Sequence, residues 1–389
     1  MKSLLLAIRD VLLWLTDRTA AVVNPRKSSR SDCVVLIRLD KLGDFVVWLD
    51  SARYLCDHLH SSGQRVTLVA NAEWAALAAD EAAFDEVWPV DVRRLRRNLP
   101  YRFRLITRLR KTGFRALYSL RVAKERALED ALVRAAGTPE RVGVTGVREN
   151  MDDTRLRAAE GAYTRLAVVD QRVKSERLRN QLVLRKLGFA HYTASIARIV
   201  PRQITNEFAL PHRYLAVVPG GGWAGRRWPI ERFAELCEQL SELHGLPFVV
   251  LGSASETQLG MKLVAALPHR QIIDLVGRVP LIDLPSVLRG AALVISNETG
   301  PAHLAIAVGT ETICIAGGGH FGRFVPDTVA SGPDARPRLT VVNIELPCYG
   351  CNWRCPFISD PNDMPPCVSS ISVGAVLTAV EDRLRLIER

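Results

Sequence analysis

The sequence lacks the two glycine motifs that mark the commonest nucleotide-binding folds. No G-x-G-x-x-G stretch is present, which argues against a nicotinamide or flavin dinucleotide site. The glycine-rich segment PGGGWAGRRWP (219–229) does not end in the G-K-[ST] of a P-loop, which disfavours ATP hydrolysis. Self-similarity at a fixed period is missing as well, so solenoids and propellers are not indicated.

Long uninterrupted apolar runs are also missing, even at the start of the chain. In the first segment, MKSLLLAIRDVLLWLTDRTAAVV, Arg9 and Asp10 break the apolar core that a signal peptide needs, and the charges argue against a bilayer-spanning helix. Helical spacing places the charges on one side of a helix. On the other side lie five apolar residues: Leu4, Ile8, Val11, Leu12 and Leu15. We predict an amphipathic helix in residues 1–30 that lies on a membrane surface, with docking on the body of the protein as the alternative.

Charge is unevenly distributed along the chain. The 389 residues are 48% apolar and 24% charged, as in a globular protein of two domains, and the net charge is +11. Between Arg93 and Arg126, thirteen Arg or Lys residues stand against one acid, Glu125. Such a segment repels itself unless something anionic lies nearby, so we expect an acidic partner: nucleic acid, anionic lipid or a phosphorylated substrate.

The eight cysteines fall into two groups. Four stand singly in apolar segments and are expected to be buried thiols: Cys33, Cys56, Cys237 and Cys314. The other four crowd into CYGCNWRCPFISDPNDMPPC: Cys348, Cys351, Cys355 and Cys367. Because no export signal is present, their spacing favours a structural Zn or Fe site over disulfides, with four reduced loop cysteines as the alternative.

Short apolar, β-branched runs alternate with helical patterns in two series. The first series comprises residues 33–39, 65–71, 86–90, 115–120 and 141–144, and the second comprises 214–220, 247–252, 272–277, 293–297, 311–318 and 339–344. Runs of this kind are typical of buried parallel strands joined by helices, so each half is predicted to be a doubly wound α/β domain.

The domain boundaries follow from these series. We place the first domain at 31–198, a proline-containing linker at 199–213, the second domain at 214–371 and a C-terminal amphipathic helix at 372–389. Two such domains facing each other would form one cleft at the carboxyl ends of both sheets, where ligands bind in open α/β folds.

Three polar motifs follow predicted strands and would meet at such an edge. In RLDKLGDF (38–45), Asp44 stands at a helix start, where it either caps the helix or acts as a general base. In PGGGWAGRRWP, Gly220, Gly221 and Gly222 can expose N–H groups to a phosphate, and Arg226 can neutralise a diphosphate leaving group.

The third motif is SNETGPAH (296–303), at the joint between a strand and a helix. Thr299 or Asn297 could simply cap this helix. Alternatively, the free N–H groups of the helix start bind a sugar diphosphate. Because three polar motifs share one edge, we favour the second interpretation, with Glu298 accepting hydrogen bonds from sugar hydroxyls.

Together these motifs resemble those of glycosyltransferase family 9, the ADP-heptose heptosyltransferases of lipopolysaccharide assembly. RLDKLGD, PGGGWAGRRWP, LGSASE and SNETGPAHLAIAVG occur in the family's order, and the resemblance covers nearly the whole chain beyond residue 30. It implies a GT-B fold of two Rossmann-like domains, an inverting transfer and no catalytic metal.

The resemblance also implies roles for single residues. Asp44 matches the family's proposed base, and Arg226 stands where the family usually has a lysine on the donor diphosphate. Glu256 matches a glutamate near the donor nucleoside. The residues that match positions around the donor phosphates and sugar are Thr299, Gly300 and His303.

Some positions depart from the family pattern. Glu298 replaces the commoner Asp, and Gly221 and Gly222 stand where some members have hydroxyl side chains. The cysteine cluster is similar to one that holds iron in the autotransporter-modifying branch, which acts on protein.

We therefore expect an inverting glycosyltransferase that moves heptose from ADP-heptose, or a related nucleotide sugar, to an anionic lipopolysaccharide-core acceptor. It would need no cofactor for catalysis, bind no nucleic acid and work in the cytoplasm, peripherally at the inner membrane. Transfer to a protein acceptor is the first alternative. A non-catalytic basic protein that binds membranes or nucleic acid is the second.

Overall fold

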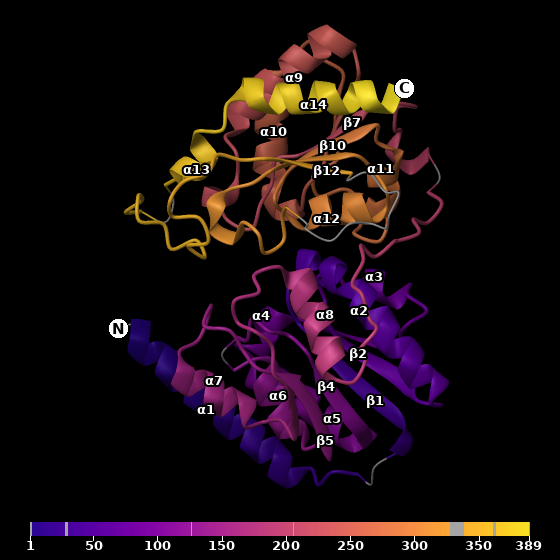
Figure 1. Cartoon of the computed structure of the whole chain (residues 1–389), viewed down its shortest axis with the longest axis vertical. Helices are drawn as coiled ribbons and strands as arrows, with labels where there is room; N and C mark the ends of the chain where they lie inside the picture. The colour runs from indigo at the N-terminus through magenta and orange to yellow at the C-terminus, as the bar shows by residue number, and fades with distance from the viewer. Residues whose placement is uncertain are drawn as a thin grey trace. The chain divides into compact units, whose positions relative to one another are not determined.

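The chain forms two compact units, each built on one parallel sheet (Figure 1). A computed structural model describes residues 2–27, 30–125, 127–204, 206–326, 338–360 and 363–388. By their contacts, the first unit comprises Met1–Lys41, Trp48–Lys174 and Leu178–Ala194, and the second comprises Leu42–Val47, Ser175–Arg177 and Ser195–Arg389. The fold prediction of two Rossmann-like α/β domains is confirmed.

The sheet of the first unit has six parallel strands in the order β3-β2-β1-β4-β5-β6. They are β1 (Arg30–Arg38), β2 (Arg65–Asn71), β3 (Glu86–Val90), β4 (Phe114–Ser119), β5 (Glu140–Val144) and β6 (Arg165–Ala167). The sequence patterns predicted the first five strands and missed β6, which has only three residues and a charged first position. The α-helices between residues 2 and 186 are α1 (Lys2–Val23), α2 (Leu42–Ser61), α3 (Ala75–Ala79), α4 (Val92–Leu95), α5 (Leu99–Thr112), α6 (Glu129–Ala136), α7 (Asp153–Glu160) and α8 (Glu176–Lys186).

The sheet of the second unit is also parallel, in the order β12-β11-β10-β7-β8-β9, and all six of its strands were predicted. They are β7 (Leu215–Val218), β8 (Phe248–Val250), β9 (Ile272–Asp274), β10 (Leu293–Asn297), β11 (Thr312–Ile315) and β12 (Leu339–Val342). The α-helices are α9 (Ile230–His244), α10 (Thr257–Ala266), α11 (Leu284–Gly290), α12 (Gly300–Ala307), α13 (Pro366–Ser369) and α14 (Val373–Glu388). Short 3-10 turns are η1 (Asn206–Phe208), η2 (Ala224–Arg226), η3 (Ala254–Glu256) and η4 (Gly318–His320).

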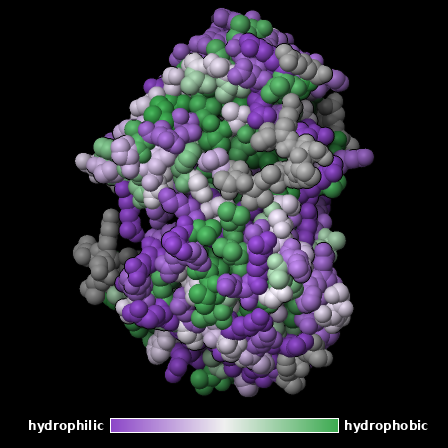
Figure 2. Space-filling view, viewed as in Figure 1, coloured by the Kyte–Doolittle hydropathy of each residue, from purple (hydrophilic) through white to green (hydrophobic). Residues whose placement is uncertain are grey.

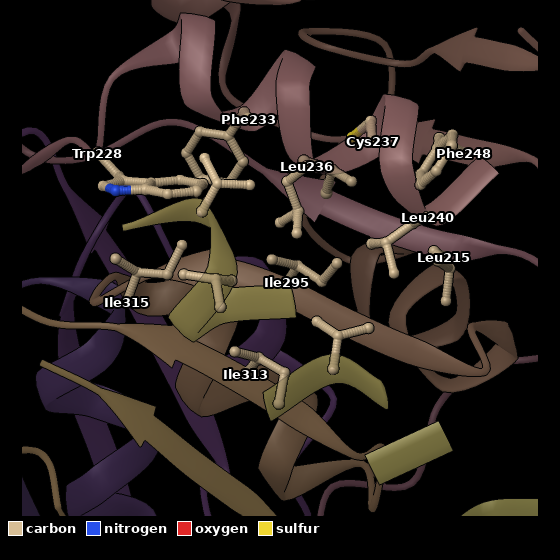
Figure 3. Close-up of a cluster of buried hydrophobic side chains, with 14 of the residues drawn as sticks. Leu215, Trp228, Phe233, Leu236, Cys237, Leu240, Phe248, Ile295, Ile313 and Ile315 are labelled. Atoms are coloured by element: carbon tan, nitrogen blue, oxygen red, sulfur yellow. The ribbon is translucent and has the colours of Figure 1, made fainter. Parts of the chain in front are cut away.

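The core of the second unit lies between its sheet and helices α9, α10 and α14. Figure 3 shows Phe233 and Leu236 of α9 over Ile295 and Ile313 of the central strands. These four side chains are fully buried, and Trp228 packs edge-to-face on Phe233. This apolar layer holds the strands of the second unit rigidly, so their carboxyl ends make a firm base for polar residues.

In both sheets the chain reverses its direction of winding once. In the first sheet the reversal falls between the neighbouring strands β1 and β4. In the second sheet it falls between the neighbouring strands β7 and β10. Parallel sheets bind ligands at the carboxyl ends of the strands at this point, because the helices leave in opposite directions there. The motif at 219–229 directly follows β7, and the motif at 296–303 begins with the last two residues of β10.

Helix α1 docks on the first unit and still exposes an apolar face. It packs on α5 and α6 through the buried Leu13 and Ala20, and its Asp17 accepts from the buried Arg102 Nη2 at 2.7 Å. Burial raises the pKa of Asp17, against the lowering effect of Arg102. On the exposed face lie large apolar side chains: Leu5, Ile8, Val11, Leu12, Trp14 and Leu15. The alternative of docking is therefore confirmed, but the face that we assigned to the membrane stays uncovered in the described chain. The side chain of Leu4 lies outside the described residues.

Within the parts of the chain that the structure describes, no helix is long and apolar enough to span a bilayer.

The basic segment that begins at Arg93 is less one-sided than its sequence indicates. Arg102, Arg121 and Lys124 are buried, and their partners include acids from other segments: Asp17, Glu129 and Asp130. Arg126 lies outside the described residues. Five exposed cations form no ion pair with any described residue: Arg93, Arg97, Arg104, Lys111 and Arg115. Figure 2 shows hydrophilic side chains over much of the visible face of this unit, with hydrophobic ones between them.

Candidate active site

A glycine loop, residues 219–222, follows β7 and is fastened to the end of β10 by Asn297. The fully buried Asn297 amide donates from Nδ2 to the carbonyls of Pro219 and Gly220, at 2.8 and 3.0 Å. Its Oδ1 accepts from the Trp228 backbone N–H at 3.0 Å. Asn297 thereby holds both ends of the segment PGGGWAGRRWP. From the sequence we expected Asn297 at most to cap a helix, but its side chain does not do so.

Glu256 supports the glycine loop from the opposite side. Its Oε1 accepts from the Gly221 N–H, and its Oε2 accepts from the N–H and the hydroxyl of Ser253, each at 2.8 Å. A Cβ at Gly220 would overlap this carboxylate, so a larger residue there would displace Glu256 from the loop. The Gly221 N–H is thus already used within the protein, and Gly222 is the more exposed glycine of the loop. The role of Glu256 near a nucleoside stays a prediction.

Arg226 and Glu298 form an ion pair across the ends of β7 and β10. Arg226 Nη2 donates to Glu298 Oε2 and, at 3.0 Å, to the Glu298 backbone carbonyl. The Glu298 side chain is 8% exposed and that of Arg226 is 19% exposed. Arg226 Nε is buried and has no hydrogen-bond acceptor in the described chain. The guanidinium lies over the ring of Trp353, with Cζ 5.2 Å from the ring centroid.

The start of α12 presents backbone donors that are not capped by the side chain of its N-cap residue in the described chain. Thr299 occupies the N-cap position with an extended backbone, yet its hydroxyl accepts no cap hydrogen bond and lies 3.5 Å from Ser296 Oγ. Pro301 falls in the first turn, where the missing N–H costs nothing. His303 follows on the first turn, buried, with its ring 5.9 Å from that of Phe324. Helix starts of this kind attract anions.

Asp44 lies in the first turn of α2, in the short segment Leu42–Val47 that belongs to the second unit by its contacts. Its neighbour Gly43 lies against the start of α12, where a Cβ added to Gly43 would be 3.2 Å from His303 Cδ2. A Cβ on Gly300 would likewise press on the Leu42 side chain at 2.9 Å. The half-buried Asp44 carboxylate has no hydrogen-bond or ion-pair partner among the described residues, and it caps nothing there.

The four clustered cysteines lie in the second unit. All four are free thiols, with Cys367 buried and the other three half-buried. Burial raises the pKa of the Cys367 thiol, and the three other cysteines raise it further. Nevertheless, no three His, Cys, Asp or Glu side chains of the described chain are grouped so that they could hold a metal ion. The arrangement does not support the predicted structural metal, which elemental analysis of the purified protein would test directly.

The sequence model of glycosyltransferase family 9 (heptosyltransferase) matches residues 103–329, more than half of the chain. This chain belongs to glycosyltransferase family 9. It is accordingly a glycosyltransferase, and the alternative of a non-catalytic binding protein is not supported. Lipopolysaccharide heptosyltransferase 1 of Pseudomonas aeruginosa is 25% identical over 295 residues, which cover 73% of this chain and 78% of that protein.

Solved structures of heptosyltransferases share the fold. The E. coli ADP-heptose lipopolysaccharide heptosyltransferase II gives a TM-score of 0.68 at 18% identity and covers 92% of this chain and 99% of its own. E. coli heptosyltransferase WaaC, solved with ADP, gives 0.59 at 19% identity, with 91% and 98% covered. The iron-containing dodecameric heptosyltransferase TibC, in complex with ADP-D-β-D-heptose, gives 0.55 at 14% identity, with 93% and 78% covered.

The roles of two residues at this site were not predicted from the sequence. Asn297 binds the glycine loop, and Trp353 lies beside Arg226. Asn297 ends a buried strand that is apolar except for Ser296, and a polar residue at such a position is a weak signal for this role. No sequence signal connects Trp353 to Arg226, because more than a hundred residues separate them.

The role of Asn297 leads to a stability prediction. Asn297→Ala leaves two buried carbonyls and the Trp228 N–H without partners, so we expect the free energy of unfolding to fall by about 2 kcal/mol. Urea unfolding would measure this loss, with the exposed Gln258→Ala as the matched amide control. Equal stability of the two variants would contradict the fastening role.

Proposed function

We propose that this enzyme transfers heptose from ADP-heptose to a lipopolysaccharide-core acceptor with inversion at the anomeric carbon. The observation that carries the proposal is the meeting of the uncapped start of α12, Arg226 and the glycine loop at the reversal point of the second sheet. Family membership and the substrates in the relatives' names support the same donor class.

In this proposal the donor diphosphate takes the place of Glu298 as the main partner of Arg226. Arg226 has a spare buried Nε–H beside its Nη groups, so it can bind two oxygens of the leaving group. The N–H groups at the start of α12 add partial positive charge. Both groups stabilise the charge that grows on the departing diphosphate, and Glu298, once released, can accept hydrogen bonds from sugar hydroxyls.

Asp44 is the proposed general base. Glycosyl transfer to a hydroxyl requires that the hydroxyl lose its proton as the new bond forms. A carboxylate that has no partner among the described residues is suited to accept it. With the base on the acceptor's face and the diphosphate on the other, a single displacement inverts the anomeric configuration. The proton passes to Asp44, the new C–O bond forms, and the bond to the diphosphate breaks.

The donor assignment is tested with purified protein and a panel of nucleotide sugars. We expect ADP-heptose to bind and to be consumed in the presence of a heptose-deficient lipopolysaccharide core, with ADP released. Transfer to a protein acceptor in place of the lipid core would support the alternative that we set out from the sequence. Binding of a different nucleotide sugar, with ADP-heptose ignored, would overturn the donor assignment.

A lipid-core acceptor is anionic and anchored in a bilayer, so we also propose peripheral membrane contact at the cytoplasmic face of the inner membrane. The exposed apolar face of α1 would enter the headgroup region. Exposed cations such as Arg93, Arg97 and Arg104 would add attraction of about 1 kcal/mol each near an anionic surface.

The membrane contact predicts salt-dependent binding to vesicles that contain anionic lipid. We expect Leu12→Ser with Leu15→Ser to lower binding by about tenfold, because each side chain removes apolar area from the headgroup region. Leu243→Ser with Met261→Ser, at slightly more exposed positions of the second unit, is the matched control. Deletion of α1 is less informative, because it leaves the buried Arg102 without Asp17. If the intact chain ignores anionic vesicles at low salt, the membrane contact is wrong.

A further inference from the structure

A cysteine loop, residues 348–355, is fastened on three glycines that follow β11. The Gly350 N–H donates to the Gly318 carbonyl at 2.8 Å, and the Asn352 N–H donates to the Gly319 carbonyl at 3.0 Å. The indole of Trp353 lies directly on the backbone of Gly319, where any Cβ would overlap the ring. The glycines therefore allow the loop to lie flat against the end of the second sheet.

The backbone of this loop is strained at its tip. Asn352 and Trp353 have φ values of +50° and +60°, a left-handed conformation that non-glycine residues rarely adopt, least of all two in succession. The Asn352 side chain holds this turn through its Oδ1, which lies 2.9 Å from His320 Nε2. Strain of this kind persists only where surrounding contacts enforce it, and it is concentrated at functional sites.

The strained turn places Trp353 beside Arg226. The guanidinium lies over the indole, and Trp223 of the loop after β7 meets the same ring edge-on, with the centroids 5.8 Å apart. Trp353 Nε1 is buried and has no acceptor in the described chain, and the same is true of Arg226 Nε. Buried N–H groups are almost always satisfied in folded proteins. Two unsatisfied donors on side chains in contact indicate a shared partner that carries only acceptors.

We infer that Trp353 is a donor-binding residue, whose indole N–H donates to an oxygen of the donor diphosphate and whose ring holds Arg226 in place. The inference rests on the proposed function, because a diphosphate is the acceptor-rich group assigned to Arg226. It also gives the cysteine loop a role in donor binding. The loop carries one wall of the donor site on a strained turn, which its backbone contacts with Gly318 and Gly319 maintain.

Trp353→Phe tests the indole N–H, because it keeps a ring over Gly319 and beside Arg226. We expect the affinity for ADP and for ADP-heptose, measured by titration calorimetry, to fall about tenfold, since the lost hydrogen bond is to a charged group. The KM for the acceptor should not change. Trp353→Leu removes the cation–π contact as well and should lose more donor affinity. Trp353→His keeps a ring N–H and should recover part of the loss.

Trp88→Phe is the matched control. Trp88 of β3 also has a buried indole N–H without an acceptor in the described chain, but it belongs to the first unit, on an edge strand of the other sheet. Its replacement should leave donor affinity unchanged. Melting temperatures of all variants are measured in parallel, so that loss of donor affinity is separated from loss of stability.

The outcomes separate the inference from the proposed function. If the wild type binds ADP-heptose and Trp353→Phe binds it equally well, the inference is overturned while the proposed function stands. A Phe variant that is less stable but has unchanged donor affinity overturns it too, because packing alone gives that result. If the wild type binds neither ADP nor ADP-heptose, the donor assignment falls and the inference falls with it.

Discussion

Asp44→Asn is expected to lower kcat by at least about 10²-fold while the affinity for the donor stays nearly intact. The reason is that Asp44 interacts with the departing proton only in the transition state. Asn has the shape of Asp but cannot accept the acceptor's proton at neutral pH. The carboxylate has no ion pair or hydrogen bond among the described residues, so its loss should not unfold the protein. Steady-state kinetics with saturating donor, together with calorimetry of donor binding, would measure both quantities.

Asp57→Asn is the control for this substitution. Asp57 lies on the exposed part of the same helix, α2, so the charge change is equal but falls away from the proposed chemistry. It should leave kcat within about twofold, as surface substitutions usually do. A loss for Asp44→Asn that appears only as a raised donor KM would assign Asp44 to binding and refute its role as the base.

Arg226→Met is expected to lower kcat by about 10²-fold, the usual cost of removing one electrostatic contact to a developing charge. The same change also removes the ion-pair partner of the buried Glu298. The free energy of unfolding should therefore fall by roughly 3 kcal/mol, the cost of an uncompensated buried charge. Thermal melting and single-turnover kinetics separate the two effects.

Two further variants show which effect dominates. Adding Glu298→Gln to Arg226→Met removes the unpaired charge, so stability should return while turnover stays low. Arg226→Lys keeps the positive charge, so most of the activity should remain. Restored turnover in the Met–Gln double variant would show that Arg226 serves folding alone.

The layered architecture, and the points where polar segments follow the strands, could be predicted from local sequence patterns. Buried parallel strands are continuous runs of β-branched and apolar residues, a local property, so eleven of the twelve strands were predicted from such runs. Because carboxyl ends of parallel strands share one edge, the segments after β7 and β10 were expected together, and Arg226 does meet Glu298 there. The exception, β6, begins with the charged Arg165 and has one large apolar residue, Leu166, so it forms no such run.

The tertiary structure alone decided which side chains pair. The basic segment after Arg93 looked unopposed because Asp17, Glu129 and Asp130 stand elsewhere in the sequence or beyond its end. Likewise α1 has two usable faces, and packing of Leu13 and Ala20 on α5 and α6 decided which one is covered. Partner choice depends on loop conformation and on distances across the fold. Neither is encoded in a local sequence period. The contact between Trp353 and Arg226 is an example, because it depends on a strained turn that packs against three glycines.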